Sequence, residues 1–118
     1  MRSDASNTFS KAERLSSKKD ISRLLNHGKW GSCNALKYCI LSPNGAGINR
    51  LVVAVPKKYF KRAVKRNLLK RRIREAYRTQ KGLAAACGAD ILIQYESQEI
   101  LDFQTIYELV GRILRMVK

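Results

Sequence analysis

Residues 61–78 constrain the fold most, because as a helix they would carry an apolar stripe on one face and a cationic stripe on another. At about 100° per residue, one face collects the apolar residues Leu69, Ile73, Ala76 and Tyr77. A second face collects one amide and four cations: Asn67, Lys70, Arg71, Arg74 and Arg78. A helix of this kind must bury its apolar stripe against another element and keep its cations at the surface.

Short apolar runs bounded by turn residues predict the strands on which this helix packs. They cover residues 35–42, 50–55 and 89–95, and a weaker extended segment surrounds Trp30. In the first run, Leu36, Tyr38 and Ile40 share one face, and the last run is apolar enough to be buried on both faces.

Two further helices are predicted from caps and periodicity. Ser16 or Ser17 can cap a helix that ends near Gly28, with Asp20 in its first turn. Asp102 can cap a last helix whose single apolar face holds Phe103, Ile106, Tyr107, Val110, Ile113, Leu114 and Val117. Elements in this order predict a small two-layer α/β sandwich of the α+β class. It forms one domain over residues 9–118, after a flexible arm over residues 1–8. Phe9 and Leu15 are expected to anchor the segment before the first helix.

The charge of the chain is concentrated in one segment. The formal net charge is +15, and residues 50–81 hold 13 basic residues against one acid, Glu75. A solvated helix face normally interleaves acids, so these cations repel one another unless a polyanion neutralises them. Nucleic acid is the expected partner, and an anionic membrane surface is the alternative. Arginine outnumbers lysine within residues 61–78, which favours nucleic acid, and a helix that belongs to the core favours RNA.

The remaining composition argues against chemistry by the protein itself. Its acids are sparse and scattered and His27 is its one histidine, so no carboxylate cluster or histidine pair for a nuclease is visible. The chain has three cysteines, Cys33, Cys39 and Cys87, with no CxxC spacing among them. An odd number with this spacing is more typical of packed thiols in a reducing cytoplasm than of disulfide bonds or a zinc site. No apolar stretch predicts a signal peptide or a membrane helix.

One string within the basic helix closely resembles a known family. Residues 65–75, KRNLLKRRIRE, resemble the arginine-rich "RNR" helix of the bacterial ribonuclease P protein component. Four flanking segments resemble that family at the expected spacing: residues 9–15, 20–28, 55–58 and 90–93.

The resemblance implies a fold of order α-β-β-β-α-β-α with a left-handed βαβ crossover. It implies a protein without catalytic residues of its own, partnered with the ribonuclease P catalytic RNA, which together remove the 5′ leader of precursor tRNA. The RNA would hold the Mg²⁺ ions, and no cofactor would be tightly bound to the protein. Neither a membrane nor a stable protein partner would be required.

The resemblance also assigns candidate RNA-binding residues. Family positions correspond to Lys57, Lys58, Arg66, Asn67, Lys70, Arg71 and Arg74. The charge pattern adds four more: Lys61, Arg62, Lys65 and Arg78. Leu68 stands where the motif usually has its second arginine, and Pro56 replaces a frequent small polar residue.

The same family binds the leader in a cleft between the first helix and the sheet. Ile21 and Leu25 occupy the cleft positions, where many members carry phenylalanine. At i, i+4 spacing both are better explained as core residues. Trp30 or Tyr38 could then supply the aromatic surface for leader bases.

Two other functions fit the basic helix. A structural RNA-binding protein without a catalytic partner would bind folded RNA but not stimulate leader removal. A domain for anionic membranes would bind lipid without selecting folded RNA.

Overall fold

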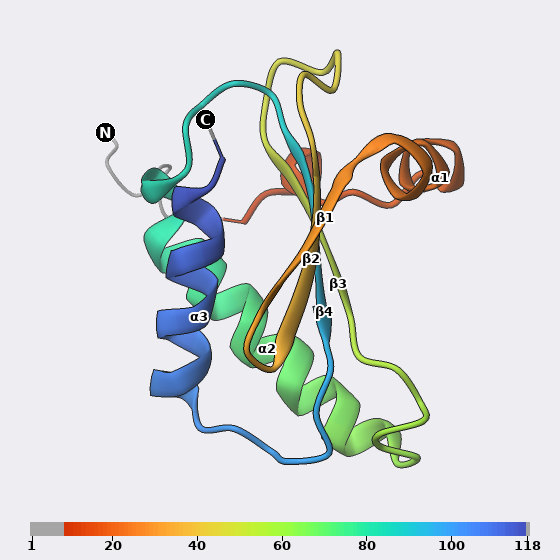
Figure 1. Ribbon diagram of the computed structural model, residues 1–118, viewed down its shortest axis with the longest axis vertical. Helices are drawn as coiled ribbons and strands as arrows, with labels where there is room; N and C mark the ends of the chain where they lie inside the picture. The colour runs from red at the N-terminus through yellow and green to blue at the C-terminus, as the bar shows by residue number, and fades with distance from the viewer. Residues whose placement is uncertain (1–8, 118) are drawn as a thin grey trace.

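The computed structural model describes residues 9–117, and the predicted arm over residues 1–8 lies outside them. Its three helices and four strands follow the α-β-β-β-α-β-α order implied by the resemblance (Figure 1). The elements are η2 (Lys11–Glu13), α1 (Lys18–His27), β1 (Lys29–Cys33), β2 (Leu36–Leu41), β3 (Arg50–Ala54), α2 (Ala63–Gln80), η3 (Lys81–Leu83), β4 (Asp90–Tyr95) and α3 (Phe103–Arg115). The weak extended segment around Trp30 is therefore a full strand, β1.

The four strands form one mixed sheet in the order β1-β2-β4-β3. β2 pairs antiparallel with both β1 and β4, whereas β3 lies parallel to β4. Because parallel neighbours need a crossover, α2 connects β3 to β4 and is held against the sheet. The predicted α+β class is confirmed.

α2 and α3 cover one face of the sheet (Figure 1). The predicted apolar stripe of α2, including Leu69, Ile73 and Tyr77, is buried there against the β4 residues Ile91 and Ile93. α3 adds the buried part of its predicted apolar face, so this side of the sheet holds the main hydrophobic core. We call this side the core face.

α1 lies on the opposite face of the sheet (Figure 1). Its Leu24 is fully buried in a second, smaller cluster with Leu15, Cys39 and Leu92. Helices therefore cover both faces, and α1 adds a partial third layer that the two-layer description did not include. We call this side the α1 face.

α1 leaves one row of the α1 face partly open. The row crosses all four strands, because Ser32 pairs with Lys37, Lys37 pairs with Gln94 and Gln94 pairs with Ala54. All four residues are partly or fully exposed. We call these four residues the open row.

The ends of the helices follow the predicted caps. The backbone N–H of Asp20 donates to Ser17 Oγ at 3.4 Å, and the N–H of Thr105 donates to Asp102 Oδ1 at 2.9 Å. Gly28 ends α1 with φ −76°, which is not left-handed. A Cβ at Gly28 would lie 2.5 Å from Cys39 Sγ, so this glycine allows the close approach of α1 to β2.

The segment before α1 is anchored by the two predicted residues. The Phe9 ring packs edge-on against Tyr77, with centroids 5.6 Å apart. Leu15 is buried, and its N–H donates to the carbonyl oxygen of Leu51 at 2.9 Å. Residues 9–15 thus cross from the core face to the edge strand β3.

Candidate nucleic-acid interface

The predicted cationic face of α2 lies at the surface. Asn67, Arg71 and Arg74 are exposed, and Lys70 and Arg78 are partly exposed. We call these five residues the cationic ridge. Among the described residues 9–117, the side chains of Lys70, Arg71 and Arg74 have no hydrogen bond or ion pair.

Further cations extend the ridge toward the start of α2. Lys57, Lys58, Lys61, Arg62 and Lys65 are all exposed on the loop before the helix and on its first turn. Lys58 Nζ lies 5.0 Å from the centroid of the Tyr59 ring. The charged surface therefore continues from the middle of α2 to the carboxyl ends of β3 and β4.

Several predicted RNA-binding cations already have protein partners. Arg66 Nη1 donates to the carbonyl oxygens of Phe60 and Lys61, at 2.8 Å each, and so holds the loop that precedes α2. Arg78 forms an ion pair with Glu75 at 2.6 Å, which lowers the pKa of Glu75 through its hydrogen bond. Solvent screens an exposed pair of this kind, so it contributes little to stability and a phosphate could replace Glu75.

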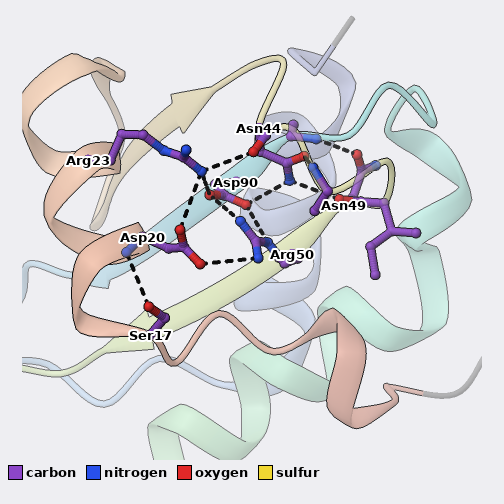
Figure 2. A network of polar contacts seen from close by, with 10 residues as sticks. Ser17, Asp20, Arg23, Asn44, Asn49, Arg50 and Asp90 are labelled. Carbon is purple, nitrogen blue, oxygen red and sulfur yellow. Dashed lines mark hydrogen bonds and ion pairs between the residues drawn. The ribbon is translucent and has the colours of Figure 1, made fainter.

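Arg50 belongs to the fold, although it counts toward the basic segment. Asp90 is fully buried and accepts from Arg50 Nε at 2.8 Å, from Arg50 Nη2 at 3.0 Å and from Asn44 Nδ2 at 2.7 Å (Figure 2). Asp20 of α1 joins this network, 3.3 Å from Arg50 and 3.4 Å from Arg23. The hydrogen bond to Asp90 raises the pKa of Arg50. We call these five residues the buried charge network; it ties the first turn of α1 to the sheet.

Three of the four residues predicted for leader binding come together on the α1 face. Ile21 is partly buried against the second cluster, whereas Leu25 is 41% exposed and is not a core residue. Trp30 is 44% exposed, and its indole Nε1 donates to the carbonyl oxygen of Leu25 at 3.2 Å. Trp30 is thereby held beside the end of α1.

Tyr38 does not join them on the α1 face, because its ring lies on the core face of the sheet. Successive strand residues point to opposite faces, and Tyr38 packs against the main cluster of the core face. Its ring lies over Gly31, where a Cβ would clash with Tyr38 Oη. Tyr38 and Trp30 do both line a hollow of about 590 Å³ at the outer edge of β1.

The sequence analysis did not single out the polar side chains on the α1 face near the carboxyl end of β4. Lys37 Nζ lies 4.9 Å from the centroid of the Trp30 ring. Glu96, directly after β4, accepts from Tyr59 Oη at 3.3 Å and from Gln94 Nε2 at 2.6 Å. The alternation of β4 could have placed Gln94 and Glu96 on one face, but Tyr59 reaches them only through the tertiary fold.

The thiols and acids show no arrangement for a metal in the described part of the chain. Residues 9–117 contain no group of three or more His, Cys, Asp or Glu that could hold an ion. Cys33 and Cys39 are buried, Cys87 is partly exposed, and burial raises the pKa of the Cys39 thiol. No helix described between residues 9 and 117 is long and apolar enough to cross a membrane.

Comparison with known proteins settles the family. The model of the ribonuclease P family matches residues 9–118, nearly the whole chain. The chain belongs to the ribonuclease P protein family. A ribonuclease P protein component from Porphyromonas gingivalis is 37% identical over 114 residues, covering 90% of this chain and 83% of the relative. One from Thermotoga maritima is 31% identical over 116 residues, covering 94% and 97%.

Solved structures of the family share this fold. The ribonuclease P protein of Thermotoga maritima matches with a TM-score of 0.78 at 29% identity, covering 90% of this chain and 98% of that one. The protein of Staphylococcus aureus matches with a TM-score of 0.76 at 24% identity. As a ribonuclease P protein component, the chain is part of a ribonucleoprotein endoribonuclease of tRNA processing, and its partner is the ribonuclease P RNA.

Proposed function

We propose that this protein binds the catalytic RNA through the cationic ridge, and the 5′ leader of precursor tRNA across the α1 face, to promote removal of the leader. The observation that carries the proposal is the set of unpaired cations on one rigid helix: Lys70, Arg71 and Arg74. Cations without acid partners repel one another, and phosphates would remove that repulsion.

The ridge suits an RNA backbone better than a lipid surface. Arginine can bind two phosphate oxygens through its planar guanidinium, while Lys70 adds a point charge. Asn67 adds a neutral donor and acceptor for a sugar hydroxyl or a base edge. The buried stripe of α2 fixes the helix on the sheet, so the spacing of these groups is set before RNA binds.

The α1 face suits a single strand. Trp30, Leu25 and Ile21 offer an aromatic and apolar surface beside the open row, and Lys37 lies above the indole ring. Stacking of an unpaired base on an aromatic ring contributes about 1 to 3 kcal/mol and tolerates many sequences. Trp30 would therefore take the role that phenylalanine on the first helix has in many relatives.

The protein would supply binding, and the RNA would supply the chemistry. Asp90, the buried acid of the described chain, is saturated by Arg50 and Asn44, and Glu75 and Glu96 have hydrogen-bonded partners of their own. We therefore assign the Mg²⁺ ions to the RNA and no catalytic residue to the protein. It would act in the cytoplasm, without a further protein partner.

Reconstitution tests the proposal directly. The protein is mixed with the ribonuclease P RNA of its own organism and a precursor tRNA at low millimolar Mg²⁺, and leader removal is measured with and without protein. The proposal predicts strong stimulation and no cleavage by the protein alone. Binding of folded RNA without stimulation would contradict it and favour a structural RNA-binding role.

A further inference from the structure

One acid, Glu96, lies beside the surface of the α1 face that is assigned to the leader. Glu96 is partly exposed next to the open row, and its neighbours are the cations Lys37 and Lys58. A carboxylate there repels phosphates, so a surface that bound only the RNA backbone would gain nothing from it. Its position calls for a role other than phosphate binding.

Glu96 is held as a charged acceptor. Its hydrogen bond from Gln94 and the nearby Lys58 and Lys37 lower the pKa of the carboxyl group, so it is ionised at neutral pH. Tyr59 Oη donates to one carboxylate oxygen and Gln94 Nε2 to the other. Each oxygen keeps a second lone pair, and an ionised carboxylate can only accept hydrogen bonds.

The surroundings of this acceptor suit the edge of a base. Trp30 lies on the same face, two strands across and two strand rows along the sheet, with Lys37 in the row between it and Glu96. A single strand with one base stacked on Trp30 can lay a neighbouring unpaired base across the same face, with its polar edge available to other side chains. Glutamate on a base edge accepts from an exocyclic amino group, as it does from cytosine N4.

We propose, resting on the proposed function, that Glu96 is a specificity-determining residue: it accepts a hydrogen bond from the amino group of an unpaired leader base, in a position fixed by Tyr59 and Gln94. Cytosine, adenine and guanine carry such an amino group. Uracil does not, and its N3–H is flanked by two carbonyl oxygens that a carboxylate repels. The site therefore selects against uracil at one leader position.

The test uses the reconstituted holoenzyme and precursor tRNA with a randomised leader. Sequencing of the cleaved and uncleaved pools gives the relative cleavage rate for each base at each position. With the unmodified protein, uracil should be disfavoured by about fivefold at one position, the size expected of one base-edge contact. With Glu96→Gln, whose amide can also donate to uracil O4, the difference should fall below about twofold.

Glu108→Gln is the matched control. Glu108 is also an exposed glutamate that accepts from a glutamine, Gln104, but it lies on α3 on the other side of the sheet. It should keep the base preference of the unmodified protein. An equal gain for all four bases with Glu96→Gln would show that Glu96 acts through repulsion alone, and an unchanged profile would show no role; either result overturns the inference. Absence of stimulation by the unmodified protein would instead overturn the proposed function.

Discussion

The two faces of the sheet are built from different chemistry. The core face is apolar, with Leu36, Ile91 and Ile93 fully buried beneath α2 and α3. The α1 face has a small apolar cluster around Leu24, and beside it the buried charge network in which Asp90 is the fully buried acid. The core face therefore holds most of the buried apolar surface, whereas the α1 face leaves polar and aromatic side chains such as Lys37 and Trp30 partly exposed.

The largest loss of unfolding free energy is expected from a substitution in the buried charge network. Asp90→Ala leaves Arg50 partly buried without its main partner, and breaking such a pair costs about 3 to 5 kcal/mol of unfolding free energy. Urea unfolding measures the loss. Asp102→Ala removes an exposed helix cap and should cost much less. Equal losses for the two variants would show that the network does not hold the α1 face.

The stability that Tyr77 contributes to the core face should fall at alkaline pH. Burial raises the pKa of Tyr77 from 10.0 to about 12, so the ionised phenolate favours the unfolded chain. The stability from the neutral hydroxyl is complete below pH 10 and is lost as the pH rises toward 12, by about 2 to 3 kcal/mol. Urea unfolding at pH 9 and pH 12 should show this loss in the unmodified protein. Tyr77→Phe should lack that part of the loss, and an identical fall in both proteins would contradict a buried neutral hydroxyl.

Substitutions in the cationic ridge should weaken RNA binding and leave the free energy of unfolding nearly unchanged. Arg71→Ala combined with Arg74→Ala should lower the log–log salt slope of RNA binding by about 0.7 to 0.9 for each lost phosphate contact. Arg72→Ala is the control, because Arg72 Nη1 donates to the carbonyl oxygen of Leu101 at 2.6 Å and belongs to the fold. It should reduce stability and leave the slope unchanged. An unchanged slope in the double variant would remove the ridge from the interface.

The smallest effect is expected from the thiols. Cys39→Ser keeps a donor for the carbonyl oxygen of Leu24, which Cys39 Sγ contacts at 3.3 Å, and Cys87→Ser replaces a partly exposed thiol. Each should change the unfolding free energy by about 1 kcal/mol or less and leave leader removal intact. Loss of leader removal by a folded variant would indicate a metal or redox role.

The local structure could be predicted from the sequence because its causes are local. The cap of α1 at Ser17, the cap of α3 at Asp102 and the apolar stripe of α2 each depend on residues within a few positions of one another. The family could be predicted for the same reason, since its main motif is one continuous helix over residues 65–75.

The partners of the charged residues could not be predicted, because they come from distant parts of the chain. Arg72 and Arg74 are two residues apart on one helix, yet Arg72 binds a carbonyl oxygen near α3 while Arg74 is exposed. Arg50 meets Asp90 only once β3 lies beside β4. The side of the sheet on which Tyr38 lies follows from local alternation, because Tyr38 shares a face with Leu36.

Photo-crosslinking tests most directly the claim that the α1 face binds the leader. A benzophenone amino acid is introduced in place of Ser32, on the open row, or in place of Gln104, exposed on α3 across the sheet, and each protein is assembled with the ribonuclease P RNA and a labelled precursor tRNA. We expect crosslinks to the leader from position 32 and none from position 104. Leader crosslinks from position 104 alone would place the leader on the other side of the molecule and contradict it.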